Sequence, residues 1–303
     1  MPEPSDAVRD VAARRAAARR DRDFAGADAL RDELATLGFR MVDRPDGYDL
    51  EPLAPPVARR TAPRDVPSVL DAPPDLDVTV QWVVQGWPED AARGIASFSA
   101  SAPSDLRVQY LVVDASGTAP EAFPAVAEVV AIDGDPGWGA LRALALRRSR
   151  GAVLLVVDGS VEATGDAISP LVHALDDPAV GIAGPFGIVS DDLREFREDE
   201  GPEVDAIEGY LLAVRRDVLL DAGAFDERFR FYRSADIDLS FRIRDRGWSA
   251  RVVEVPVTRH EHRGWHRTPE VERDAASKRN FYRFLERFRG RTDLLVARGR
   301  GRP

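Results

Sequence analysis

The sequence contains no cysteine, only two methionines and a single lysine, Lys278, and it has no long apolar run. Without cysteine, disulfides, zinc–thiolate sites, iron–sulfur clusters and thiol nucleophiles are excluded. The longest purely aliphatic run, residues 152–157, is far shorter than the about 20 residues that a membrane-spanning helix needs. Because the first ten residues are polar and acidic, no secretory signal is expected. The predicted location is the cytoplasm, with peripheral attachment at the inner membrane face left open.

The chain does contain enough apolar material for folded domains. Of its 303 residues, 44% are hydrophobic and 31% are charged, and the formal net charge is −10. At about 100–200 residues per domain, this length predicts about two domains. The apolar content excludes a mostly disordered chain, and the negative charge argues against a general nucleic-acid-binding protein.

Changes in composition divide the chain into four regions. Residues 1–53 predict two helices and a β-hairpin, and residues 54–75 are rich in proline and predict a linker. Residues 76–290 alternate short apolar runs with helical patterns, which predicts an α/β domain. Residues 291–303 are rich in arginine at their end and predict a flexible tail.

The first region has clear helix and turn signals. Ala27, Leu30, Leu34 and Leu37 recur at spacings of three and four and predict one apolar helix face. Gly38 is a typical residue for ending that helix. The turn residues of segment 44–47 lie between two apolar runs, which predicts the hairpin.

The same region, residues 8–53, resembles the C-terminal helical appendage of bacterial cysteinyl-tRNA synthetases. The segment contains none of the synthetase's catalytic domain, so no synthetase chemistry is implied. Two interpretations stay open: a borrowed packing module, or a contact with tRNA or a protein through the arginine-rich first helix. The matching pieces are at residues 22–24, 27–34, 37–38 and 43–47.

In the larger region, two apolar strands end in an aspartate. Asp114 follows one of them and Asp158 follows another. Strands that alternate with helices predict right-handed βαβ units and a parallel sheet, which binds ligands at the carboxyl ends of its strands. A nucleotide with its metal ion is therefore expected at this edge. The predicted strands are residues 78–84, 108–113, 126–132 and 152–157.

Residues 76–290 also resemble a family 2 glycosyltransferase of the GT-A fold, a Rossmann-like mixed sheet with helices on both faces. Eight motif-like pieces occur in the family's order, which makes the resemblance specific for the fold. The matching pieces lie at residues 78–84, 111–117, 137–139, 154–158, 204–216, 223–229, 235–242 and 247–262.

The resemblance implies a site for a nucleoside-diphosphate sugar. It gives Asp114 a contact with the nucleotide base, Asp158 a contact with the diphosphate and its metal ion, and Ser160 a contact with the nucleotide sugar. Carboxylate oxygens suit Mg²⁺ or Mn²⁺, and imidazole can join as a Mn²⁺ ligand. His260 and His262 alternate at a spacing of two, so on a strand they would share a face and one of them would complete the metal site.

The resemblance also implies an inverting transfer to a hydroxyl group, with Asp236 as the general base. The acceptor would be a glycan, a lipid-linked compound or a small molecule. Asp236 can also be interpreted as an acid that stabilises a helix N-terminus, and Asp114 and Asp158 as ordinary turn residues.

The sequence departs from the family pattern at two acidic positions. Ser160 replaces the second acid of the DxD motif, and Ala235 replaces the usual glutamate before Asp236. A lost carboxylate weakens metal binding, because affinity follows ligand charge. A second hypothesis is therefore a catalytically degenerate protein that binds sugar nucleotides or docks RNA or a partner. A nucleotidyltransferase of related fold is a third, against which the run of residues 225–242 argues.

Overall fold

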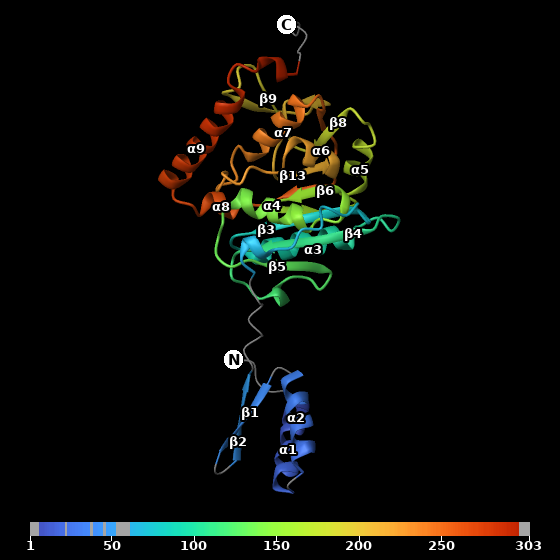
Figure 1. Ribbon diagram of the computed structural model, residues 1–303, viewed down its shortest axis with the longest axis vertical. Coiled ribbons are helices and arrows are strands. Elements are labelled where there is room, and N and C mark those ends of the chain that lie inside the picture. Colours follow the sequence, from blue (N-terminus) through green and yellow to red (C-terminus); the bar gives the residue numbers. More distant parts are fainter. Residues whose placement is uncertain (1–5, 22, 37–38, 45–46, 53–60, 297–303) are drawn as a thin grey trace. The chain divides into compact units, whose positions relative to one another are not determined.

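The chain divides into two compact units, Met1–Arg59 and Arg60–Pro303 (Figure 1). The structure is a computed structural model that describes residues 6–21, 23–36, 39–44, 47–52 and 61–296. Four predicted features lie outside these residues: the helix stop at Gly38, positions 45–46 of the hairpin turn, linker residues 54–60 and the tail from residue 297 onward. Within the described ranges, every helix is too short or too polar to cross a membrane.

The first unit contains two helices and a β-hairpin. Its core is small and consists mainly of aliphatic side chains from both helices, closed by Phe39 of the hairpin. The two hairpin strands pair antiparallel. The elements are α1 (Asp6–Arg20), α2 (Phe24–Thr36), β1 (Phe39–Arg44) and β2 (Gly47–Pro52).

The second unit is built on an eight-stranded mixed sheet with the order β11-β14-β8-β13-β6-β3-β4-β5. The neighbours of β3 are parallel to it, whereas β13 runs antiparallel to both β6 and β8. The carboxyl ends of β3, β4 and β6 therefore meet at one edge. The strands are β3 (Leu76–Val84), β4 (Val108–Asp114), β5 (Ala127–Ala131), β6 (Gly151–Val157), β8 (Val180–Gly184), β11 (Glu203–Val204), β13 (Leu211–Arg215) and β14 (Ser249–Val252).

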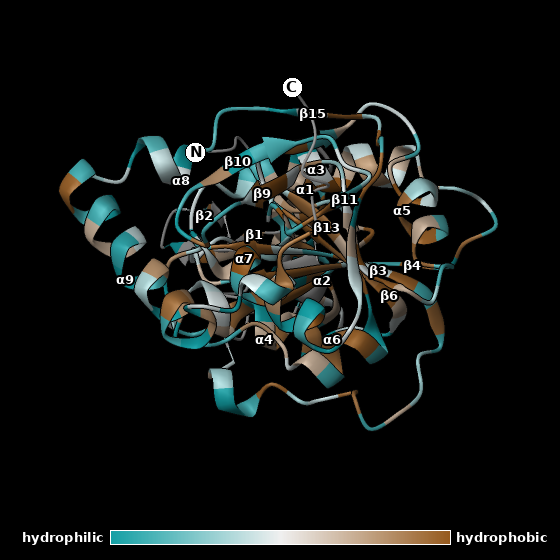
Figure 2. Cartoon of the chain, turned by 90° about the horizontal axis from the view of Figure 1, so that it is seen from above, coloured by the Kyte–Doolittle hydropathy of each residue, from teal (hydrophilic) through white to brown (hydrophobic). Residues whose placement is uncertain are grey.

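Helices cover both faces of this sheet. On β6, Val153, Leu155 and Val157 pack in the cluster of α3 and α5, whereas Leu154 and Val156 pack in the cluster of α6 and α7 on the other face. This alternation explains why the strand is apolar along its whole length, and Figure 2 shows β3, β6 and β13 mainly in the hydrophobic colour. The helices are α3 (Pro88–Ala100), α4 (Trp138–Arg148), α5 (Ser169–Ala174), α6 (Arg216–Ala222) and α7 (Ala235–Asp245).

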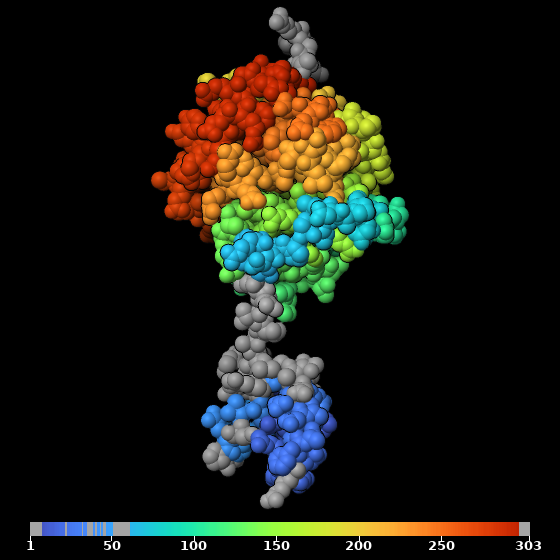
Figure 3. Space-filling view, viewed as in Figure 1, coloured from blue at the N-terminus to red at the C-terminus, as the bar shows by residue number. Residues whose placement is uncertain are grey.

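Two small sheets and two further helices surround the edge where the strands end. The long helix α9 lies against α7, and both are seen together in the red and orange part of Figure 3. The sheets are β10-β9-β12 (Phe196–Asp199, Gly187–Ser190, Ala206–Ile207) and β15-β7 (Val257–Arg259, Val161–Ala163), and the helices are α8 (Arg263–His266) and α9 (Glu270–Phe288).

Both predicted boundaries of the α/β domain differ from the structure. Residues 61–75 were predicted as linker, but Val66 is buried against α4 and β4, and the Arg216 guanidinium donates to the carbonyl oxygens of segment 69–72. At the other end Leu294 packs beside α9, and the Val296 N–H donates to the buried Asp205. Irregular backbone is held here because side chains of the sheet unit satisfy its polar groups.

Candidate functional site

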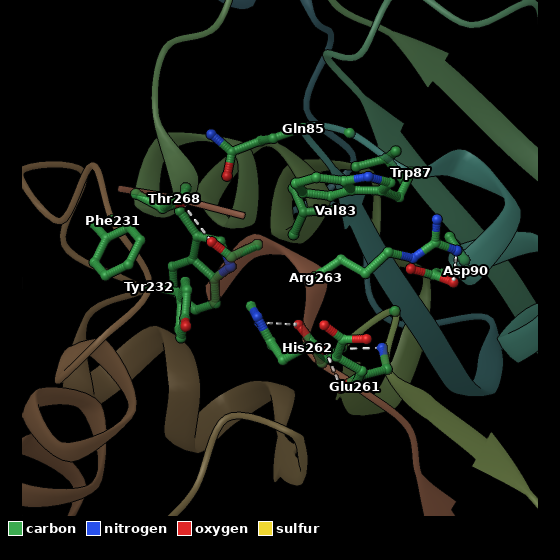
Figure 4. Close-up of a pocket in the computed structure, with 18 of the residues that line it drawn as sticks. Val83, Gln85, Trp87, Asp90, Phe231, Tyr232, Glu261, His262, Arg263 and Thr268 are labelled. Carbon is green, nitrogen blue, oxygen red and sulfur yellow. Dashed lines mark hydrogen bonds and ion pairs between the residues drawn. The ribbon is translucent and has the colours of Figure 1, made fainter. Parts of the chain in front are cut away.

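A cavity of about 260 Å³ opens at the carboxyl ends of β3 and β6. Gln85 and Trp87 line it on one side and Tyr232 on another, as Figure 4 shows. His262 and Arg263 line it from the start of α8. Polar and aromatic groups converge there from five separate parts of the chain. We refer to this space as the donor cavity.

Asp158, the residue after β6, lies in the donor cavity beside His262. Its Oδ2 is 3.3 Å from the Nε2 of His262, and its Oδ1 accepts hydrogen bonds from the backbone N–H and the hydroxyl of Ser160. Burial alone would raise the pKa of Asp158, but the bonds from His262 and Ser160 outweigh it and the pKa is lowered. The carboxylate therefore stays ionised.

His262 begins helix α8 and is held there by its other ring nitrogen. Its Nδ1 accepts a hydrogen bond from the Trp265 N–H, so the Nε2 carries the proton that faces Asp158. Burial lowers the pKa of His262, but the hydrogen bond to Asp158 and the charge of Asp158 together raise it by more, so the net shift is upward. The ring also packs against Tyr232, with centroids 4.4 Å apart.

The donor set of Asp158 and His262 fits a divalent cation only in part. Among the described residues, no group of three or more His, Asp or Glu side chains is arranged to hold a metal ion. The Asp158 carboxylate can nevertheless face an ion, and His262 can join it only after its Nε2 loses the proton and its Nδ1 releases the Trp265 N–H. Mg²⁺-type ions are often held by one or two carboxylates together with substrate phosphates and water. The residues present therefore suit an ion that arrives with a diphosphate.

His260 was predicted as the alternative metal ligand, and the structure places it elsewhere. Its Nε2 is 2.6 Å from a carboxylate oxygen of Glu162, and it does not line the donor cavity. The prediction assumed that a strand continues to residue 262. Because β15 ends at Arg259 and His262 caps α8, the two histidines do not share a face.

Asp114 was predicted to contact the nucleotide base, and its side chain is fully buried at the end of β4. Its Oδ1 accepts hydrogen bonds from the N–H and the hydroxyl of Ser116, at 2.9 and 2.6 Å. Asp114 does not line the donor cavity. The bonds to Ser116 hold the turn after β4, which is the ordinary role of an aspartate at a strand end.

A second cavity, of about 280 Å³, adjoins the donor cavity and contains Asp236. Trp138, Asp158, Tyr232 and His262 line both spaces, so the two adjoin at the Asp158 side chain. We refer to the second space as the acceptor cavity. The structure thus brings Asp158 and Asp236 to one cleft, although they are 78 positions apart in the sequence.

Asp236 lies in the first turn of α7. Its Oδ2 accepts from the Gly209 N–H at 2.7 Å, and its Oδ1 accepts from the Ile237 N–H at 2.9 Å. Burial raises the pKa of Asp236, and these backbone N–H groups only partly oppose the shift. A carboxylate with a raised pKa is a stronger proton acceptor.

Two charged groups at this site were assigned no role from the sequence. Glu208, which precedes β13, lines the acceptor cavity, and burial together with the charge of Asp236 raises its pKa to about 7. Arg142 of α4 is buried behind the donor cavity, where it donates to the carbonyl oxygens of Gln81 and Val157. Burial lowers the pKa of Arg142, and the charge of Asp158 opposes this. Only the arrangement of the strands brings these groups to Asp158 and Asp236.

The start of α4 is fixed to the loop that carries Tyr232. The Trp138 and Gly139 N–H groups donate to the carbonyl oxygens of Arg230 and Phe229. A Cβ on Gly139 would lie 2.4 Å from the Asp226 carbonyl oxygen, so an added methyl group must displace this backbone.

We therefore expect Gly139→Ala to lower the free energy of unfolding by about 1–3 kcal/mol, the usual cost of overpacking. Chemical denaturation measures it. Gly86→Ala is the matched control, because a Cβ at Gly86 meets nothing within 4 Å. Equal stability of the two variants would contradict the close approach.

Asn280 of α9 holds the same loop from the opposite side. It is 2% exposed, and its amide donates to the carbonyl oxygens of Phe231 and Arg233 at 2.6 and 2.9 Å. Asn280→Ala would leave these acceptors without that donor, so we expect a loss of about 1–3 kcal/mol of stability. Lys278→Ala on an exposed position of α9 is the control. A thermal unfolding midpoint of Asn280→Ala equal to that of the control would refute this role.

Comparison with solved structures shows the fold of the second unit. A solved structure described as GalNAc-T7 with UDP, GalNAc and Mn²⁺ superposes with a TM-score of 0.56 and 15% identity, covering 70% of this chain and 48% of that one. A mannosyltransferase, PcManGT from Pyrobaculum calidifontis in complex with GDP-Man and Mn²⁺, has a TM-score of 0.49 and 18% identity, covering 76% and 71% of the two chains. The unit has the GT-A glycosyltransferase fold.

At the level of sequence, the similarity is confined to a short segment. A stretch of 45 residues is 56% identical to the cysteine–tRNA ligase of Opitutus terrae (strain DSM 11246 / JCM 15787 / PB90-1), which is 15% of this chain and 10% of the ligase. This agrees with the predicted resemblance of the first unit. No protein-family model matches the chain.

Proposed function

We propose that the second unit transfers a sugar from a nucleoside-diphosphate sugar to a hydroxyl group, with inversion at the anomeric carbon. The observation that carries the proposal is that Asp158 and Asp236 line the same cavity at the carboxyl edge of a GT-A sheet, and that Asp158 also lines the donor cavity. Asp158 and Ser160 face the diphosphate side of this cleft, and Asp236 faces the acceptor side. The neighbouring transferases of the same fold, described with nucleotides and Mn²⁺, support this class of donor.

In this proposal Asp236 takes the proton of the acceptor hydroxyl as its oxygen attacks the anomeric carbon. The bond from that carbon to the diphosphate breaks, and the diphosphate leaves with the electron pair. Arg230 and Arg263 line the donor cavity, and the buried guanidinium of Arg142 adds positive charge behind it. Asp158 and His262 would hold Mn²⁺ or Mg²⁺, which neutralises the charge of the leaving diphosphate when bound.

The test is the release of nucleoside diphosphate from a panel of nucleotide sugars, with Mn²⁺ or Mg²⁺ and with water or sugar alcohols as acceptors. We expect turnover of at least one donor, with inverted stereochemistry in the product. Donor binding without turnover would instead support the degenerate binding protein, which the substitution of an acid by Ser160 favours. A contact of the first unit with tRNA or a protein stays a prediction.

A further inference from the structure

The acceptor cavity continues beyond Asp236 into a third cavity of about 160 Å³. Glu198 of β10 and Glu208 line both spaces, so these two carboxylates stand where the two spaces adjoin. We refer to the second and third cavities together as the acceptor chamber. This chamber leads from the proposed base to the small sheet β10-β9-β12.

Acidic groups outnumber basic groups in the acceptor chamber. Besides Asp158, which is engaged by His262, five carboxylates line it and two guanidinium groups oppose them. One of these, on Arg259, lies over the rings of Phe186 and Tyr210 at 4.6 and 4.8 Å and is 3.9 Å from the Glu208 carboxylate. The five acids are Glu198, Asp199, Glu200, Glu208 and Asp236, and the two bases are Arg233 and Arg259.

Glu208 is a half-buried acid of the chamber that the mechanism does not use. Its side chain is 19% exposed, and the nearest cation, Arg259, is too distant for a hydrogen bond. The repulsion between Glu208 and Asp236 is therefore only partly compensated. A positive charge placed between these two carboxylates would relieve it.

Aromatic rings complete the lining. Phe196, Tyr210 and Tyr232 line the acceptor cavity around the carboxylates. An ammonium group is attracted both by aromatic faces and by carboxylates, whereas a phosphate or a carboxylate is repelled by this surface.

We propose that the acceptor carries a protonated amine close to the hydroxyl that is glycosylated, and that Glu208 recognises this amine. The inference rests on the proposed transfer reaction and specifies its acceptor class. Acceptors with a phosphate or carboxylate near the reacting hydroxyl are excluded by the same charges.

The test compares three matched hexoses as ligands of the full-length protein: glucosamine, glucose and glucuronate. They offer an ammonium, a neutral hydroxyl and a carboxylate on the same ring. We expect isothermal titration at neutral pH to show glucosamine binding about tenfold more tightly than glucose, equivalent to about 1.4 kcal/mol, and glucuronate binding most weakly. In Glu208→Gln the advantage of glucosamine over glucose should disappear. Glu195→Gln, on an exposed acid outside the chamber, should keep it.

The outcomes separate this inference from the proposed function. Equal binding of the three sugars, preference for glucuronate, or an unchanged glucosamine preference in Glu208→Gln would overturn the inference, even if donor turnover is observed. Glucosamine binding that depends on Glu208 in a protein that turns over no donor would support the amine site and refute the transfer reaction.

Discussion

We expect the kcat of the Asp236→Asn variant to fall on the order of a thousandfold, which is within the range that a general base contributes. The amide has nearly the shape of the carboxylate but cannot accept the hydroxyl proton. Because the donor cavity is lined by other residues, KM for the nucleotide sugar should change little. Steady-state kinetics with saturating acceptor measures both constants.

The pH dependence of the wild type checks the same assignment. Since burial raises the pKa of Asp236, kcat/KM should rise with pH as this carboxyl loses its proton, with a midpoint above the ordinary range of aspartate. Asp217→Asn, on an exposed acid of α6, should leave kinetics and profile unchanged. Wild-type turnover in Asp236→Asn would remove Asp236 as the base.

The second large effect is expected at Asp158. Asp158→Asn removes the negative charge that faces His262 and would hold a divalent cation. Loss of metal-assisted charge neutralisation removes several kcal/mol of transition-state stabilisation, so we expect kcat/KM for the donor to fall on the order of a thousandfold. Titration of the donor with and without Mn²⁺ should show that the variant binds without a metal-dependent gain in affinity.

Asp133→Asn is the matched control for this experiment. Asp133 is exposed after β5 and lines neither the donor nor the acceptor cavity. The donor affinity and turnover of the Asp133→Asn variant should equal those of the wild type. A retained metal-dependent gain in Asp158→Asn would show that the cation is held by other residues.

The parts of the site that could be predicted are those encoded locally. Asp158 follows a short apolar run that predicts a buried strand, and Asp236 lies at the start of the helical run 235–242. Strand ends and helix starts are fixed by short-range patterns. Their meeting in one cleft also follows from the rule that ligands bind at the carboxyl edge of such sheets.

The parts that could not be predicted depend on contacts between distant segments. Glu208 becomes a site residue only because the Gly209 N–H next to it binds Asp236, which places its carboxylate in the same cavity. Asp114 has the same pattern as Asp158, yet its carboxylate is fully buried and lines neither the donor nor the acceptor cavity. His260 and His262 do not share a face because β15 ends at Arg259, before both of them, and His262 caps α8.

The boundaries of the α/β unit could not be read from composition for a similar reason. Proline-rich sequence predicts a linker because it forms no regular structure. In this chain Arg216 of α6 donates hydrogen bonds to three carbonyl oxygens of segment 69–72 and holds this segment on the unit. A long-range side-chain contact of this kind leaves no local signal.

The central claim is that the cleft between Asp158 and Asp236 binds a nucleoside-diphosphate sugar. A thermal-shift screen of nucleotide sugars, with and without Mn²⁺, tests it most directly, because a ligand at 100 times its Kd stabilises the folded state by about 2.7 kcal/mol. We predict that at least one nucleotide sugar raises the unfolding temperature, more strongly with Mn²⁺, and that the metal-dependent part is lost in Asp158→Asn. No shift with any nucleotide sugar, or an identical shift in the variant, would contradict the account.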